Sequence, residues 1–172
     1  MKLFNILSGK KRTAGGCAAV IVAAGSSSRM GGIDKLTASL RGERLIAHTL
    51  RAFESCSDIS EIVLVTREDR LDEMSEIAVS AGIKKLRCVV IGGSTRAESS
   101  LAGVMAVSEN VPLVAIHDGA RPLVTGKVIS AAVKKAAVTG AAIPVIPMND
   151  TLKRADCGVI TESVERSGTY RV

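Results

Sequence analysis

Short apolar segments rich in β-branched residues alternate along the chain with longer segments in which apolar residues recur every three or four positions. The short segments predict strands buried on both faces: AAVIVAA (18–24), EIVLVT (61–66), LRCVVI (86–91), LVAIHD (113–118) and AAIPVI (141–146). Helical spacing covers three longer segments, at residues 43–56, 70–82 and 125–140. This alternation predicts an α/β, Rossmann-like fold with a mostly parallel central sheet flanked by helices.

The pattern changes after about residue 147. Short alternating segments flank residues 156–158, and the run GVITESVE predicts the second strand of a β-hairpin. We expect this hairpin to form a projecting β-arm over about residues 147–170, within a single domain that spans residues 17–172. The chain stops at Val172 with no helix or cap to finish it, so we also expect a C-terminal piece to be missing.

Composition narrows the class of protein. The chain has 172 residues, 47% hydrophobic and 23% charged, which is typical of one folded globular domain. The net charge is +6, and no acid offsets the four basic residues within residues 1–12, so residues 1–16 are predicted to form a flexible basic leader. Nucleic-acid binding is not expected, because one tyrosine, two phenylalanines and no tryptophan cannot build a base-stacking platform.

Neither a secretory signal nor a membrane span is predicted. The apolar run near the N-terminus is short and precedes its basic cluster, which is the wrong order for a signal peptide. No other apolar run has membrane-spanning length, so no membrane partner is expected. The four cysteines are scattered without a C-x-x-C pair, which favours buried, reduced thiols in a cytoplasmic protein over disulfides or zinc.

Ligands in parallel sheets bind beyond the carboxyl ends of the strands, which here means residues 24–36, 92–99 and 117–122. The first of these segments is made of small residues, which let backbone N–H groups wrap an anion: Ala23, Ala24, Gly25, Ser26, Ser27 and Ser28. Arg29 and Lys35 add two cations beside them. A solvated glycine–serine loop with surface charges is the alternative, and the loop alone only slightly favours phosphate binding.

Three familiar glycine motifs do not fit this loop. A P-loop requires a lysine directly after its second glycine, and none follows Gly31. The dinucleotide fingerprint fails because Ser27 stands where its second glycine belongs. The serine-hydrolase elbow fails because Arg29 takes the place of its last glycine.

The run AAGSSSRMGGIDK resembles the A-A-G-x-G-x-R-M…K signature of sugar-nucleotidyltransferase-like enzymes, and within them that of the 2-C-methyl-D-erythritol 4-phosphate cytidylyltransferase family. Later segments agree in order: GGSTRAESSLAG (92–103), HDGARPLV (117–124), NDTLKRA (149–155) and VERSGTY (164–170). The resemblance covers roughly residues 17–172. It departs from the family at Asp34 and Leu36, which flank Lys35 where P-K-Q is usual, and at Ser27 and Gly119.

The resemblance implies a nucleotidyltransferase that transfers CMP from CTP to 2-C-methyl-D-erythritol 4-phosphate and releases pyrophosphate, in non-mevalonate isoprenoid synthesis. Arg29 and Lys35 match the family's catalytic pair. The phosphate loop at residues 23–28 would hold the nucleotide, together with four residues of the second segment: Gly92, Gly93, Arg96 and Ser99. Asp118, at the end of a predicted strand, would bind substrate and ligate Mg²⁺. The alternative for Asp118 is a turn residue ahead of Gly119.

The same resemblance implies that Arg121 supports the substrate or the geometry of its loop, and that Thr151 and Arg166 contact the sugar or polyol phosphate. Thr151 and Arg166 lie on the predicted arm, which would reach into a neighbouring subunit and so implies a homodimer. An ordinary exposed hairpin is the alternative for this arm. His117 and His48 are interpreted as packing or hydrogen-bonding residues, since a phosphate nucleophile is already ionised at neutral pH and needs no base.

Two further functions stay open. A ribitol 5-phosphate cytidylyltransferase would share the fold, the loop and the arm, and nothing in the residues separates the two five-carbon acceptors. A non-catalytic nucleotide-binding regulatory protein is the alternative from another class. The presence of Arg29, Lys35 and Asp118 argues against it, because a protein that only binds nucleotide has less need of all three.

Overall fold

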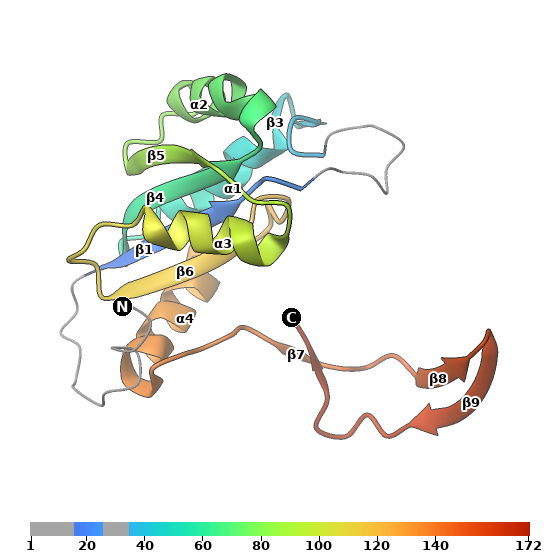
Figure 1. Ribbon diagram of the computed structural model, residues 1–172. Helices are drawn as coiled ribbons and strands as arrows, with labels where there is room; N and C mark the ends of the chain where they lie inside the picture. The colour runs from blue at the N-terminus through green and yellow to red at the C-terminus, as the bar shows by residue number, and fades with distance from the viewer. Residues whose placement is uncertain (1–15, 26–34) are drawn as a thin grey trace. The chain divides into compact units, whose positions relative to one another are not determined.

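The structure is a computed structural model that describes residues 16–25 and 35–172 (Figure 1). The predicted basic leader therefore lies almost wholly outside the described residues, as do Ser26, Ser27, Ser28 and Arg29. The chain divides into two units, Met1–Ala141 and Ala142–Val172. The prediction of a single domain over residues 17–172 stays a prediction, and the two units are described separately.

The first unit is built on a parallel sheet of four strands in the order β5-β4-β1-β6. The strands are β1 (Cys17–Val22), β4 (Ile59–Thr66), β5 (Leu86–Ile91) and β6 (Leu113–Asp118). They confirm four of the five predicted strands and the α/β class. The chain runs outward from β1 through β4 to β5 and then returns to the opposite side of β1. The order therefore reverses between β1 and β6, and a crevice at such a point is where α/β sheets bind ligands.

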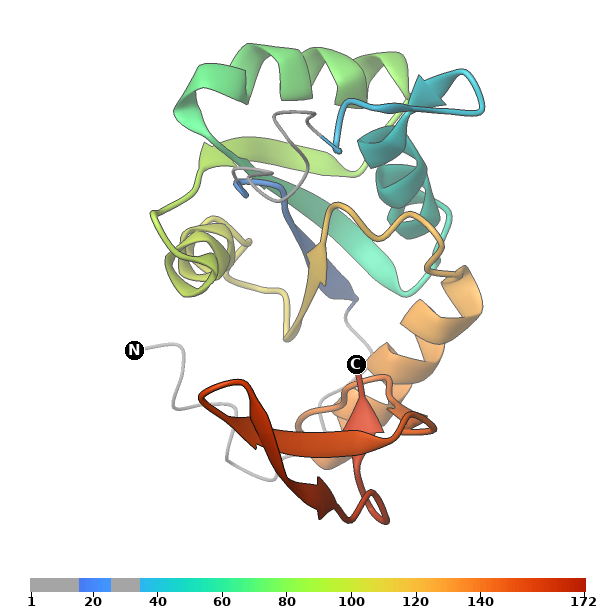
Figure 2. The same ribbon diagram turned by 90° about the vertical axis from the view of Figure 1, so that its right-hand side faces the viewer.

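Helices cover both faces of this sheet. The larger core lies under α1 (Leu45–Glu54), α2 (Leu71–Ser80) and α4 (Gly126–Thr139). The smaller core lies under α3 (Arg96–Met105), which crosses in front of the sheet in Figure 1 and is seen nearly along its axis in Figure 2. A hairpin of β2 (Ser39–Leu40) and β3 (Glu43–Arg44) leads into α1, and the 3₁₀ turn η3 (Glu68–Arg70) leads into α2. The layers are therefore helix, sheet, helix.

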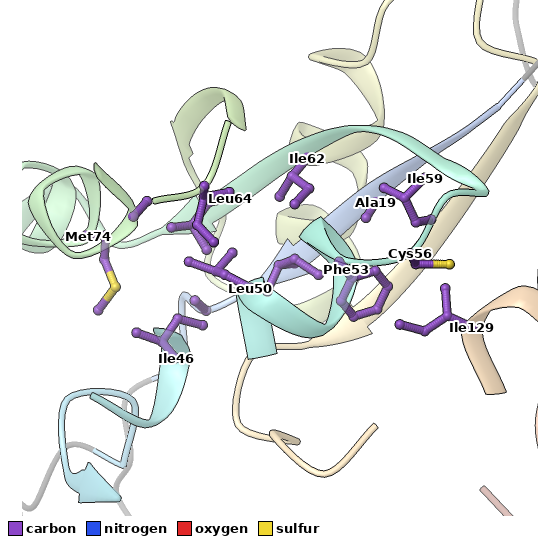
Figure 3. Close-up of a cluster of buried hydrophobic side chains, with 14 of the residues drawn as sticks. Ala19, Ile46, Leu50, Phe53, Cys56, Ile59, Ile62, Leu64, Met74 and Ile129 are labelled. Carbon is purple, nitrogen blue, oxygen red and sulfur yellow. The ribbon is translucent and has the colours of Figure 1, made fainter. Parts of the chain in front are cut away.

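The amphipathic face of α1 fills the larger core (Figure 3). Ile46, Leu50 and Phe53 are spaced at i, i+4 and i+7, so they share one side of the helix, and at most 2% of each is exposed. They pack against Ile62 and Leu64 of β4. This burial fixes α1 against the sheet beside the carboxyl ends of the strands.

The predicted strand at residues 141–146 is not formed. Residues 141–145 have no regular structure, and Ile146 belongs only to the short strand β7 (Ile146–Pro147), which pairs antiparallel with β10 (Tyr170–Arg171) in the second unit. Pro144 interrupts this apolar run, and proline cannot donate a ladder hydrogen bond, so it disfavours a central strand. The apolar character of residues 141–146 therefore did not by itself predict their structure correctly.

The second unit contains the predicted hairpin, drawn in Figure 2. Its strands β8 (Leu152–Asp156) and β9 (Val159–Val164) are antiparallel. Cys157 and Gly158 connect them with φ angles of 47° and 82°, and two positive φ values are what a two-residue type I′ turn requires. The hairpin at residues 156–158 is confirmed, whereas its role as a projecting arm stays a prediction.

Candidate active site

Three loops meet where the parallel strands end. The N–H of Ala23, after β1, donates to the carbonyl of Val65 at 2.7 Å. Those of Gly92 and Gly119, after β5 and β6, donate to neighbouring strand carbonyls at 2.8 Å each. A Cβ built on Gly92 would lie only 2.7 Å from the Cβ of Ala24, so these two loops touch. The structure thus brings together parts of all three segments that the sequence predicted to bind ligand.

The start of α3 is fixed by a capping box. The hydroxyl of Thr95 accepts the N–H of Glu98 at 3.1 Å, and the Glu98 carboxylate accepts the N–H of Thr95 at 3.2 Å. Hydrogen bonds from the side chain of Ser94 and from the backbone of Thr95 and Ser94 lower the pKa of Glu98 below its usual value. The T-x-x-E pattern at residues 95–98 is the sequence signal of such a cap. The capping box fixes the N-terminus of α3, where the helix dipole is positive, beside the loop predicted to bind nucleotide.

Ser99 lies beneath this loop. Only 2% of the residue is exposed, and its hydroxyl donates to the carbonyl of Gly93 at 3.3 Å. A Cβ on Gly92 would lie 2.6 Å from the Ser99 Oγ, so the serine also packs against the first glycine. Ser99, predicted to bind nucleotide, therefore supports the loop from below.

Asp118 joins two arginines at the end of β6. Its Oδ1 accepts hydrogen bonds from Nε and Nη2 of Arg96 at 2.9 and 2.8 Å. Its Oδ2 lies 3.1 Å from Nε of Arg121. Both arginine side chains are mostly exposed, so two forked cations face solvent beside one carboxylate. The pairing links a residue predicted to bind nucleotide with two predicted to bind substrate, and its excess of positive charge suits anionic ligands.

The site offers few oxygen ligands for Mg²⁺. Among residues 16–25 and 35–172, no three histidine, cysteine, aspartate or glutamate side chains gather in a way that could hold a metal ion. Asp118 is a single carboxylate whose two oxygens both contact guanidinium groups. Mg²⁺ commonly takes one or two carboxylates and completes its shell with water and substrate phosphates. Asp118 therefore fits an ion that arrives with the nucleotide, and not one held by the protein alone.

His117 supports the loop that follows β6. Its Nε2–H donates to the carbonyl of Arg121 at 3.1 Å, and its ring centroid lies 4.9 Å from that of Phe53. Burial lowers the pKa of His117 below its usual value, which keeps the imidazole neutral. His48 lies with Nε2 2.8 Å from the carbonyl of Leu40. Both histidines therefore pack and hydrogen-bond, as the sequence predicted.

Lys35 begins the second described stretch and is partly exposed. The next residue, Leu36, is buried, and its carbonyl accepts the N–H of Ile46 at 3.0 Å. This contact ties the residue after Lys35 to the first turn of α1. Arg29, its predicted catalytic partner, lies outside the described residues.

Thr151 and Arg166 belong to the second unit and flank the open end of the β8–β9 hairpin, where Leu152 pairs with Val164. The guanidinium of Arg166 donates to the carbonyl of Asn149, and the Arg166 carbonyl accepts the N–H of Thr169 at 3.0 Å. The hairpin thus gathers these two predicted substrate residues at one end.

The sequence predicted that the four cysteines are buried, reduced thiols. All four cysteines are free thiols; Cys17 and Cys56 are buried, but Cys88 is half-buried and Cys157 is exposed, so the expectation of four buried thiols was wrong. Cys157 is exposed because it occupies the turn of a two-stranded hairpin.

Within the described ranges, no helix has the length and apolar character needed to cross a membrane.

Comparison with known proteins identifies the family. The family model described as 2-C-methyl-D-erythritol 4-phosphate cytidylyltransferase matches residues 17–172. A protein of that name from Halalkalibacterium halodurans is 41% identical over 154 residues, which cover 89% of this chain and 67% of the relative. One from Shouchella clausii is 37% identical over 154 residues, with coverage of 89% and 67%.

A solved structure agrees with these relatives. The crystal structure of 4-diphosphocytidyl-2C-methyl-D-erythritol synthase from Anaerococcus prevotii superposes with a TM-score of 0.77 at 28% identity, covering 92% of this chain and 67% of that one. The chain thus spans about two thirds of the length of these three proteins. Since the family model matches nearly the whole chain and the fold agrees, the chain belongs to the 2-C-methyl-D-erythritol 4-phosphate cytidylyltransferase family.

Proposed function

We propose that this chain transfers the cytidylyl group of CTP to 2-C-methyl-D-erythritol 4-phosphate and releases pyrophosphate. The observation that carries the proposal is the meeting of three family segments at the carboxyl edge of the sheet, with Arg96, Asp118 and Arg121 joined there. The family name supplies the acceptor and the transferred cytidylyl group, and we take CTP as the donor. The reaction belongs to isoprenoid precursor synthesis, and we place it in the cytoplasm.

The reaction is an in-line displacement. A phosphate oxygen of the acceptor forms a bond to the α-phosphorus of CTP, while the bond from that phosphorus to the bridging oxygen breaks and its electron pair leaves with pyrophosphate. Negative charge crowds around the phosphorus, so the protein's work is to position two anions and to hold that charge. Asp118 would offer one oxygen ligand to Mg²⁺, and the ion would supply further positive charge to stabilise the phosphates.

Different residues of the chain would position the two substrates and hold the developing charge. Gly92 and Gly93 would let the loop backbone approach the nucleotide, and the N-terminus of α3, where the helix dipole is positive, follows directly after this loop. Arg96 would bind the nucleotide, and Asp118 and Arg121 would orient the sugar phosphate. Lys35, together with Arg29, takes the part of the catalytic pair that holds the developing charge.

The proposal also includes a homodimer. Thr151 and Arg166, at one end of the second unit's hairpin, would reach the sugar phosphate bound to a neighbouring subunit. Their common position at the open end of the hairpin supports a joint role, because one ligand phosphate could contact both.

The test is pyrophosphate release by the purified protein with Mg²⁺ and CTP, with methylerythritol 4-phosphate and ribitol 5-phosphate offered separately. Release with the first acceptor is the expected result. Release only with ribitol 5-phosphate would make the protein a polyol-phosphate cytidylyltransferase. Silence with both, despite measurable CTP binding, would favour a regulatory nucleotide-binding protein and overturn the proposed activity.

A further inference from the structure

The turn after β6, residues 118–121, carries two of the predicted substrate residues. The N–H of Arg121 closes it by donating to the carbonyl of Asp118 at 3.1 Å. The N–H of Gly119 donates to the carbonyl of Val22 at 2.8 Å, which ties the turn to the end of β1. The position of this turn therefore decides where the side chains of Asp118 and Arg121 stand.

A buried threonine holds the turn from α1. Thr49 is fully buried, and its Oγ1 donates to the carbonyl of Gly119 at 2.7 Å. A threonine inside a helix usually donates to a carbonyl of its own preceding turn, but Thr49 reaches a residue of another element. Because Gly119 is also buried, loss of this donor would leave its carbonyl without compensation for lost water.

The neighbours of Thr49 on α1 press against the same turn. Ile46 lies one helical turn before it, and its Cδ1 is 2.8 Å from the position of a Cβ built on Gly119. Phe53 lies one turn after it and packs on His117, whose ring donates to the carbonyl of Arg121. Figure 3 shows both apolar side chains entering the core from α1. Helix α1 thus holds the Gly119 carbonyl directly, and its Phe53 packs on the β6 histidine that holds the Arg121 carbonyl.

Displacement of this turn would reach beyond it. Asp118 pairs with Arg96, which is the first residue of α3 on the opposite face of the sheet. A shift of the Asp118 carboxylate would therefore move or release the Arg96 guanidinium as well. One buried hydroxyl on α1 is coupled in this way to charged groups from two other elements.

We propose that Thr49 is a positioning residue for the cytidylyl transfer, acting through its hydrogen bond to Gly119 on the placement of Asp118 and Arg121. This inference rests on the proposed function. Thr49 is fully buried within α1 and belongs to none of the three loops predicted to bind ligand. Its hydroxyl sets the turn that presents the two charged side chains, and His117 secures the other end of that turn.

Two variants separate the hydrogen bond from packing. Thr49→Val keeps the shape and removes the donor, whereas Thr49→Ser keeps the donor and removes a methyl group. Since a misplacement of about 1 Å can cost on the order of 100-fold, we expect Thr49→Val to lose roughly 10-fold to 100-fold in kcat/KM for the sugar phosphate. Thr49→Ser should stay within roughly threefold. Leu50→Val, on the same helix, serves as a control that disturbs packing without removing a hydrogen bond.

The kinetic outcomes decide the inference. Wild-type kcat/KM in Thr49→Val would overturn it. An equal loss in Thr49→Val and Thr49→Ser, or a matching loss in Leu50→Val, would assign the effect to packing and would also overturn it. Rescue of activity by serine alone supports the hydrogen bond, because serine restores the donor but not the lost methyl group.

A second readout does not depend on turnover. Amide hydrogen exchange of the peptide at residues 117–124 should be faster in Thr49→Val than in the wild type or Thr49→Ser, with exchange in β5 unchanged. Unchanged exchange in Thr49→Val would refute the claim that this bond holds the turn. Absence of turnover by the wild-type protein would overturn the proposed function and its catalytic consequence, while the exchange result would still decide whether Thr49 holds the turn.

Discussion

Replacement of Gly92 by alanine adds a single methyl group and should lower kcat/KM for CTP. The added Cβ would lie 2.7 Å from the Cβ of Ala24 and 2.6 Å from the Oγ of Ser99. Non-bonded carbons settle at about 3.5–4.0 Å, so the two loops must separate by roughly 1 Å. A misplacement of about 1 Å costs on the order of 100-fold in rate, hence we expect kcat/KM for CTP to fall about 10-fold to 100-fold. This corresponds to about 1.4–2.7 kcal/mol of transition-state stabilisation.

The assay is steady-state pyrophosphate release with CTP varied. Gly126→Ala is the matched control, since a Cβ there meets no atom of the described residues within 4 Å, and it should keep wild-type activity. Adding Ala24→Gly to Gly92→Ala removes one of the two obstructions and should recover part of the loss. Wild-type kinetics in Gly92→Ala, or a double variant no better than the single one, would refute the reasoning.

Four other predictions concern the core, the reactivity of the thiols, the pH dependence of stability and the catalytic pair. Leu50→Ala should lower the free energy of unfolding in urea by about 2–5 kcal/mol, and a loss below about 1 kcal/mol would contradict its place in the core. Alkylation at pH 8 should label Cys157 and spare Cys17, because burial raises the pKa of Cys17 from 9.0 to about 12; equal labelling would contradict this. Since its folded pKa is raised, the stability contributed by Cys17 is present below pH 9.0 and is lost as the pH rises toward about 12. Lys35→Ala should lower kcat by roughly 100-fold or more while CTP binding changes less, and a fall confined to CTP binding would reassign it to nucleotide binding.

The strands and the hairpin were predictable because their signals are local. Four apolar runs became the four strands of the sheet, and the turn at residues 156–158 formed where the alternating pattern and Gly158 predicted it. The run at 141–146 misled because apolar character does not report on pairing, and Pro144 removes a donor in the middle of it. Local pattern therefore predicts an element better than it predicts the neighbour of that element.

The site was predictable only in outline. The rule that ligands bind beyond strand ends located the three loops, and the family resemblance supplied the residue roles. The ion pair between Arg96 and Asp118, however, joins the start of helix α3 to the end of the edge strand β6, 22 residues further along the chain, and no local pattern predicts it. Thr49 was missed for the same reason, since its partner Gly119 lies 70 residues further along the chain. Long-range hydrogen bonds depend on packing that a pattern of single positions does not contain.

The central place of β1 in the sheet has a consequence for the way the chain folds. Of the four strands described in this sheet, β1 comes first in the chain, yet its two edges are completed by β4 and by β6, the last of the four. Closing the long loop to β6 costs entropy before any contact repays it, which makes such parallel pairing slow. During synthesis, the edge of β1 that pairs with β6 therefore stays unpaired until residue 118 has left the ribosome. Chains interrupted before β6 should expose that edge and aggregate.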